Sequence, residues 1–219
     1  MNGVMSTNPG TSARSALRFA GAVLLAAALC HPARADGPAP PGLVSHGLVG
    51  VASLSGSTRD KFGETTIAAS GIAVDRASWW REGDTLRGTI YMLPDRGWNV
   101  EGTIDYRARF HKVSLAIAPG DVTATLVDTV MLTDADGKQT TGLDPERVRA
   151  PGNGLPEMPE AVNGLVSIDA EAIVLNPDGT FFISEEYGPY IYRFSAQGKM
   201  LGAIRPPDAF IPKRKGVSN

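Results

Sequence analysis

The chain has little material for disulfides or for a serine-hydrolase triad. Its 219 residues contain one cysteine, Cys30, and three histidines, of which only His46 and His111 lie beyond residue 35. A single cysteine excludes an intramolecular disulfide, so the fold must be stabilised by burial, hydrogen bonds or a bound ion. No Gly-x-Ser-x-Gly elbow is present, and His111 stands on an apparent strand, where we expect a structural role.

Strong net charge and long apolar runs are also missing. The formal net charge is −2, and no basic patch occurs of the kind that nucleic-acid binding requires. Beyond residue 35 no run is long and apolar enough to cross a membrane. We therefore expect no nucleic-acid partner, no membrane span in the mature chain, and a monomer.

The first 35 residues have the three parts of a secretory signal peptide. Two arginines precede an apolar run over residues 19–30, and Ala33-Arg34-Ala35 supplies the small-x-small cleavage pattern. The run is too short to be a comfortable membrane anchor. We predict cleavage after Ala35, a secreted or periplasmic product, a Pro/Gly-rich linker over 36–47 and one domain over 48–219.

Short apolar runs separated by turn residues predict an all-β domain with almost no helix. Turn signals include Asp136-Gly137, Asp178-Gly179 and Gln197-Gly198. The predicted strands are Leu48–Leu54, Gly71–Val74, Thr89–Leu93, Val113–Ala118, Val122–Leu132, Ile173–Leu175, Thr180–Ser184, Ile191–Phe194 and Met200–Ile204.

An internal repeat indicates a β-propeller. Residues 88–97 align with residues 179–188, and each segment stands between two further apolar strands. The offset of about 91 residues fits either two propeller blades or one blade with a long insertion, and residues 121–142 would supply strands for a blade between. Several strands are apolar on both faces, which favours a propeller over a β-sandwich. Because the segment from Arg205 onward lacks a closing strand, we expect only the N-terminal blades of a larger ring.

Acidic residues gather at one end of a predicted hairpin. With a four-residue loop over Asn176–Gly179, Leu175 would face Thr180, and Asp169 would face Glu186, so that Asp169, Glu171 and Glu186 share one face. Like charges across a ladder destabilise it, so a cation, an arginine or a shared proton is expected nearby. Alternatively, the ladder frays and the acids are simply solvated.

Three segments of the sequence resemble the phytase-like family, also called "esterase-like activity of phytase". They are residues 93–106, 169–173 and 177–190, the last containing Ser-Glu-Glu-Tyr-Gly-Pro. The segment 209–216 is similar to one that precedes the second half of family members. The resemblance implies a secreted or periplasmic β-propeller, of which this chain holds the N-terminal part, and it suggests ester or phosphate-ester hydrolysis.

Clustered carboxylates suit a hard cation such as Ca²⁺, which takes six to eight oxygen ligands. The repeat makes Asp95 equivalent to Glu186, and a propeller brings equivalent strand ends to one mouth. We expect Glu171 and Glu186 to be catalytic, and Arg96 and Tyr187 to contact substrate. The predicted metal ligands are Asp95, Asp169, Glu171, Glu185 and Glu186.

These residues suggest an exported, metal-dependent hydrolase of phosphate monoesters or other esters, with Ca²⁺ at an acidic mouth. Two alternatives stay open. One is a non-enzymatic propeller of the cell envelope that binds a ligand or a protein. The other is an inactive truncated fragment.

Overall fold

The computed structural model describes residues 42, 44–45, 47–66, 69–96, 106–214 and 217–218. The predicted signal peptide and most of the predicted linker lie outside these residues. The chain divides into two compact units, residues 1–45 and 46–219, and every strand that the structure describes belongs to the second. Within the described residues no helix is long and apolar enough to span a membrane.

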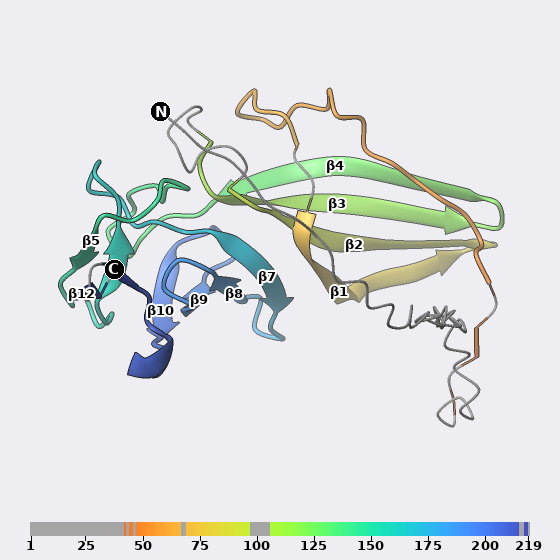
Figure 1. Cartoon of the computed structure of the whole chain (residues 1–219). Coiled ribbons are helices and arrows are strands. Elements are labelled where there is room, and N and C mark those ends of the chain that lie inside the picture. The colour runs from red at the N-terminus through yellow and green to blue at the C-terminus, as the bar shows by residue number, and fades with distance from the viewer. Residues whose placement is uncertain are drawn as a thin grey trace, which may run out of the picture. The chain divides into compact units, whose positions relative to one another are not determined.

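Two four-stranded antiparallel sheets contain most of the described strands of the second unit (Figure 1). The first sheet has the order β1-β2-β3-β4 and contains β1 (Ala69–Glu82), β2 (Thr85–Pro94), β3 (Arg109–Ala118) and β4 (Asp121–Met131). The second has the order β10-β9-β8-β7 and contains β7 (Ala170–Leu175), β8 (Phe181–Glu185), β9 (Ile191–Phe194) and β10 (Met200–Ile204).

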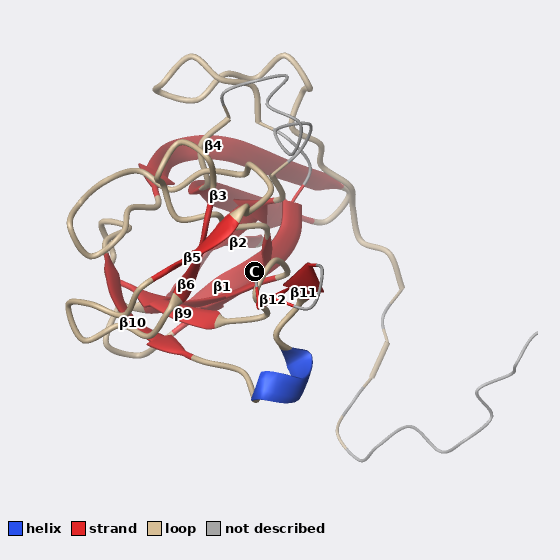
Figure 2. Cartoon of the chain, turned by 60° about the vertical axis from the view of Figure 1, so that its left-hand side comes forward, coloured by secondary structure: helices blue, strands red, loops and turns tan. Residues whose placement is uncertain are grey.

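Short elements complete the described part. Apart from one helical turn they are strands (Figure 2). These are the pairs β5 (Arg147–Arg149) with β6 (Met158–Glu160) and β11 (Lys213–Arg214) with β12 (Val217–Ser218), and the 3₁₀ turn η2 (Asp208–Phe210).

The all-β prediction is confirmed, and the two aligned repeats are equivalent strands. The repeats contain β2 and β8, each the second strand of its sheet, flanked by β1 and β3 or by β7 and β9. Neither of these sheets closes on itself in the described residues. The repeat therefore spans two consecutive sheets separated by a long insertion, residues 132–169.

Two predictions about single segments are wrong. Residues 121–142 supply no separate blade, because Asp121–Met131 is the fourth strand of the first sheet. Leu48–Leu54 forms no strand, and its Leu48 and Val51 are 84% and 73% exposed. An apolar run forms a strand only where its backbone N–H and C=O groups find hydrogen-bond partners on the edge of a sheet. Within the described residues this segment has a single bond to the turn before β4, from Gly120 N–H to Val49 O (2.9 Å).

The hairpin β7–β8 has a loop one residue shorter than predicted. Asn176 N–H donates to Thr180 O (2.8 Å), which leaves the three-residue loop 177–179, with Gly179 at a φ of 80°. Leu175 consequently pairs with Phe181 instead of Thr180, and Ile173 pairs with Ile183. A β-bulge between Ala170 and Ala172 then shifts the register back.

One hydrophobic core joins the two sheets. Phe181 of β8 lies with its ring centroid 4.8 Å from that of Tyr91 on β2 and 4.7 Å from that of Phe110 on β3. Phe181 and Phe110 are fully or almost fully buried. These contacts hold β7–β10 against β1–β3 and so fix the relative position of the strand ends that carry the acidic residues.

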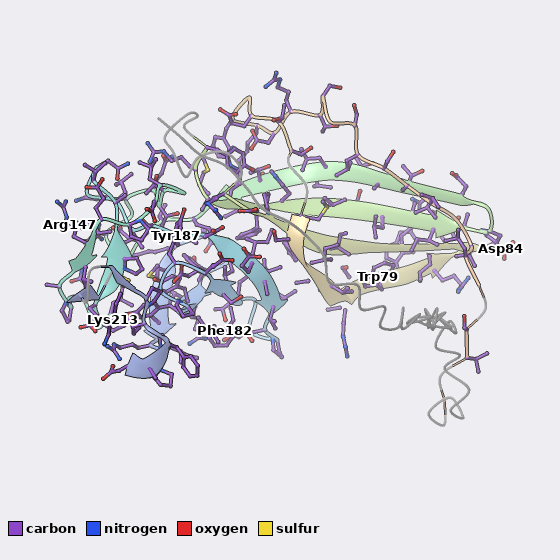
Figure 3. The ribbon with its side chains drawn as sticks, viewed as in Figure 1. Trp79, Asp84, Arg147, Phe182, Tyr187 and Lys213 are labelled. Atoms are coloured by element: carbon purple, nitrogen blue, oxygen red, sulfur yellow. The ribbon has the colours of Figure 1, made fainter. Side chains whose placement is uncertain are left out.

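Glycines allow close approaches in this arrangement. An added Cβ at Gly71 of β1 would lie 3.0 Å from the backbone of β7 at Glu171, Ala172 and Ile173. Within the first sheet, Gly88 of β2 leaves room for the indole of Trp79, which Figure 3 labels on β1. Only a residue without Cβ lets β1 approach β7 this closely.

Candidate functional site

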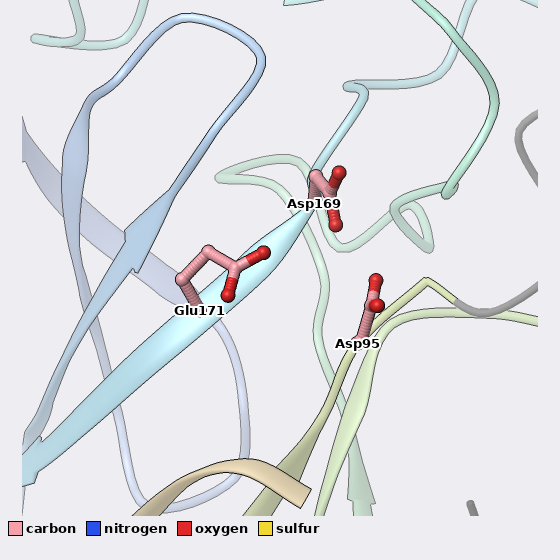
Figure 4. A group of neighbouring side chains, drawn as sticks. All are labelled: Asp95, Asp169 and Glu171. Atoms are coloured by element: carbon pink, nitrogen blue, oxygen red, sulfur yellow. The ribbon is translucent and has the colours of Figure 1, made fainter. Parts of the chain in front are cut away.

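Three carboxylates from the two sheets converge at neighbouring strand ends (Figure 4). Asp95 directly follows β2, Asp169 directly precedes β7, and Glu171 lies near the start of β7. One ligand oxygen from each lies within 4.8 Å of those of the other two. We call these three residues the acidic cluster.

Two local features of the backbone assemble the acidic cluster. The antiparallel pairing of Ala69 with Pro94 puts the start of β1 beside the end of β2. The close approach at Gly71 then brings this corner of the first sheet against the start of β7. The bulge opposite Glu185 includes Glu171, the residue that the register skips.

Asp169 is the buried member of the cluster. Its side chain is 0% exposed, and its Oδ2 accepts a hydrogen bond from Nη1 of Arg96. Its Oδ1 is buried and has no hydrogen-bond partner in the described residues. A buried carboxylate oxygen without a donor is costly and is readily satisfied by a cation.

Glu171 has an environment that disfavours its charge. Burial raises the pKa of Glu171, the nearby charges of Asp95 and Glu186 raise it further, and Arg96 partly offsets them. Glu186 is exposed, and its backbone N–H donates to the carbonyl of Asp169 (2.9 Å). The predicted pairing of Asp169 with Glu186 is therefore present, because the bulge compensates for the shorter loop.

Glu185 does not face the acidic cluster. Its Oε1 accepts the N–H groups of Gly188 (2.8 Å) and Tyr190 (3.3 Å), and its Oε2 accepts that of Tyr187 (2.8 Å). Burial raises the pKa of Glu185 to about 7 although these bonds oppose the rise. Glu185 thus holds the turn after β8, and its oxygens are already used by the backbone.

Arg96 and Tyr187, both predicted to contact substrate, lie against each other at the edge of the cluster. The guanidinium carbon of Arg96 is 5.5 Å from the centroid of the Tyr187 ring, and its Nη1 is 3.6 Å from Oδ1 of Asp95. Tyr187, labelled in Figure 3, donates its hydroxyl to the carbonyl of Gly142 (2.7 Å), and burial raises its pKa to about 12. The ring is therefore a fixed, neutral platform for the guanidinium.

His111 lies apart from these residues, on β3. It is buried, and its Nδ1 is 2.8 Å from Oγ1 of Thr129 on β4. Burial lowers the pKa of His111 to about 4, so the ring is neutral at physiological pH. This is a structural histidine, as the sequence predicts, and His46 lies outside the described residues.

The acidic cluster fits a hard cation by its chemistry. Asp95, Asp169 and Glu171 offer carboxylate oxygens only, which is the ligand type that Ca²⁺ prefers. The unpartnered Oδ1 of Asp169 is a ligand atom without another use in the described residues. Arg96 occupies the other oxygen, so a cation at this carboxylate competes with an arginine.

Sequence reasoning found the acids but missed how they are held together. The role of Gly71 depends on a contact between strands about 100 residues apart. The ion pair of Arg96 with Asp169 joins the two sheets in the same way. The sequence did contain one signal for this ion pair. Asp95-Arg96 comes shortly after a predicted strand, at the repeat position equivalent to Glu186-Tyr187, which places an arginine beside the acidic residues.

Comparisons with known proteins agree with this architecture. A family model described as "Phytase-like: esterase-like activity of phytase" matches residues 67–219. The chain is also 40% identical over 199 residues to an "uncharacterized secreted protein" of Arthroderma benhamiae, a match covering 78% of this chain and 38% of that protein. No solved structure matches the chain. The chain thus belongs to the phytase-like family, as the sequence resemblance predicts.

Proposed function

We propose that this chain is the ion-binding part of an exported hydrolase of phosphate esters or other esters. The convergence of Asp95, Asp169 and Glu171, with a buried oxygen left unpartnered, is the observation that carries the proposal. Membership of the phytase-like family supports an ester as the class of substrate. The signal-peptide pattern and the name of the secreted relative support export.

In this proposal Asp95, Asp169 and Glu171 hold Ca²⁺, with Glu186 beside them. Burial raises the pKa of Glu171 and the charges of Asp95 and Glu186 raise it further; a cation held by these residues would offset the two charges. When bound, Ca²⁺ would neutralise an anionic ester and polarise it toward attack by water. Glu185 is left out of the ligand set, since its oxygens accept three backbone hydrogen bonds.

Side chains around the cation would orient the ester and accept a proton from the attacking water. Glu171 lies among the carboxylates of the cluster and would accept a proton from the attacking water as the first candidate base. Glu186 is exposed next to it and is the second candidate base. Arg96 would bind the anionic group of the ester, and Tyr187 would hold the guanidinium in place.

We further propose that the two four-stranded sheets are neighbouring blades of a β-propeller. Both sheets run from a first to a fourth antiparallel strand in chain order, and their first strands, β1 and β7, approach each other at Gly71. Propeller blades have this order and contact. The chain spans 38% of the length of the A. benhamiae protein. We propose that further blades are formed by sequence corresponding to the unmatched part of that relative.

The test is hydrolysis by the full-length protein. It should release phosphate or p-nitrophenol from generic esters, and EDTA should abolish the release. Glu171→Ala should lower kcat by about 10²-fold or more, the usual effect of losing a general acid or base, while circular dichroism shows an intact fold. Glu146→Ala, at an exposed glutamate outside the cluster, is the matched control and should behave as wild type.

A wild-type protein that binds calcium but turns over no ester would contradict the hydrolase. Turnover that EDTA leaves unchanged would contradict the role of the metal. Turnover that survives in Glu171→Ala would move the catalytic role to another residue.

A second function, ligand binding without catalysis, is favoured by a cleft between the two sheets. The cleft has a volume of about 640 Å³ and is lined by Tyr91, Phe110 and Phe181 together with charged residues such as Lys112. This volume suits a small-molecule ligand. The cleft lies away from the acidic cluster along β2. Asp75, one of its lining residues, pairs with Thr89 of β2. Thr89 precedes Asp95 by about 20 Å of strand, at roughly 3.3 Å per residue.

A further inference from the structure

Arg96 lies at the most buried carboxylate of the acidic cluster, on the oxygen next to the one that has no partner in the described residues. Its Nη1 donates to Oδ2 of Asp169, and the same nitrogen is 3.6 Å from Oδ1 of Asp95. The side chain of Asp169 is 0% exposed, so its charge lies away from bulk solvent and is costly without a counterion. A guanidinium in this position acts as a counterion supplied by the chain itself.

This counterion neutralises the site only in part. One positive charge lies against the carboxylates of Asp95, Asp169 and Glu171, and Glu186 adds its charge to theirs. Oδ1 of Asp169 and Nε of Arg96 are both buried without a hydrogen-bond partner in the described residues. The arrangement therefore leaves hydrogen-bonding capacity unused on both sides of the ion pair.

Arg96 can leave Asp169 without losing its other contact. Its side chain is 25% exposed, whereas that of Asp169 is fully buried. The ring of Tyr187 lies 5.5 Å from the guanidinium carbon and is fixed by its bond to Gly142. A small rotation over this ring would turn the planar donor fork outward.

We propose that Arg96 is an exchangeable counterion that pairs with Asp169 until a divalent cation takes that carboxylate, and then binds the anionic group of the substrate. This inference rests on the proposed function and adds that the cation binds before the anionic ester. The cation binds first, because it releases the guanidinium. A free guanidinium suits a phosphate or phosphonate, which it binds through two parallel N–H···O bonds.

The exchange couples the two ligands. If the cation strengthens anion binding by releasing Arg96, the anion must strengthen cation binding by the same factor. Without the cation, an anion has to compete with Asp169 for the guanidinium and meets the net negative charge of the acidic cluster. Anion binding should therefore be weak until the cation is present.

Calorimetry with the folded chain tests the exchange without using turnover. CaCl₂ is titrated first, and methylphosphonate, which cannot be hydrolysed as an ester, is titrated with and without saturating Ca²⁺. The variants are Arg96→Gln, which removes the charge, and Arg96→Lys, which keeps the charge but not the fork. Arg81→Gln, at an exposed arginine of β1, is the control, and thermal unfolding checks that each variant is folded.

Arg96→Gln should bind Ca²⁺ at least about tenfold more tightly than wild type, the order expected for removing one nearby positive charge even under water-like screening. Wild type should bind methylphosphonate at least about tenfold more tightly with Ca²⁺ than without it. Arg96→Gln should lose most of that binding, and Arg96→Lys should keep wild-type Ca²⁺ affinity with weaker methylphosphonate binding. Arg81→Gln should match wild type throughout.

Two results would overturn the exchange: an unchanged Ca²⁺ affinity in Arg96→Gln, or methylphosphonate binding in wild type that ignores Ca²⁺. Both are separable from failure of the proposed hydrolase. If the calorimetric pattern holds but no ester is hydrolysed, the exchange stands and the hydrolase fails. If esters are hydrolysed but Ca²⁺ affinity ignores Arg96, the hydrolase stands and the exchange fails.

Discussion

At the scale of single residues, most of the buried charged side chains in the described part of the chain are satisfied by hydrogen bonds. Glu185 accepts three backbone N–H groups, and Arg109 forms an ion pair with Asp60 in which both side chains are almost completely buried. Asp169 departs from this pattern together with Asp95 and Arg96 beside it, because each of the three has a buried polar atom without a hydrogen-bond partner in the described residues. That contrast, and not the number of acids, is the strongest reason to place a cation at Asp169.

The buried pair of Asp60 and Arg109 gives a prediction about stability. Their atoms Oδ2 and Nη1 are 2.7 Å apart, and Asp60→Asn leaves the guanidinium uncompensated. We expect the free energy of unfolding to fall by about 3 kcal/mol, as for other buried pairs broken on one side. Urea denaturation measures this loss. Asp178→Asn, which breaks a surface pair with Arg193, is the control and should change little.

The same pair sets a pH dependence. Burial raises the pKa of Asp60, but hydrogen bonds from Arg109 and from two backbone N–H groups outweigh it, so the pKa lies below its usual 3.8. The stabilisation is therefore fully present above about pH 3.8 and is lost as the pH falls through the lower folded-state pKa. Asp60→Asn should lack this acid-dependent loss, and equal acid slopes for the two proteins would contradict the assignment.

At the scale of elements, strand identity could be predicted from the sequence, but register and close approach could not. The apolar runs at Ile173–Leu175 and Ile191–Phe194 lie in strands as predicted. Their pairing depends on whether the loop after Asn176 has three residues or four, which propensity does not decide. The bulge at Glu171 lies where β7 packs against β1, a contact between strands about 100 residues apart.

Gly71 offers a test of that packing. An added methyl group would lie 3.0 Å from the backbone of β7, so Gly71→Ala should push the two sheets apart at the acidic cluster. We expect a loss of about 1 to 3 kcal/mol in stability, typical of overpacking, and weaker Ca²⁺ binding. Gly202→Ala on β10, where no atom lies within 4 Å of an added Cβ, is the matched control. Equal Ca²⁺ affinities in the two variants would contradict the role of Gly71.

At the scale of the whole second unit, the two sheets share one core and should unfold together. Family membership and the all-β class could be predicted from the sequence. The arrangement as two consecutive sheets with a long insertion could not, because residues 121–142 resemble strands of a separate blade. Only the pairing of β4 with β3 shows that the first sheet is complete before the insertion begins.

Phe181 tests the shared core, since its ring contacts Tyr91 and Phe110 of the first sheet. Phe181→Ala should cost about 3 to 5 kcal/mol, as expected for removing a buried phenyl ring, and should lower the stability of both sheets in a single transition. Phe210→Ala, at a ring that is 67% exposed, is the control and should have little effect. Two separate transitions in thermal denaturation of wild type would contradict a common core.

The most direct test of the central claim is a calorimetric titration of CaCl₂ into the folded chain and into its Asp169→Asn variant. We expect wild type to bind Ca²⁺ saturably and Asp169→Asn to lose this binding, since the amide removes the buried charge while keeping the shape. Absence of saturable binding in wild type, or equal binding by both proteins, would contradict that claim.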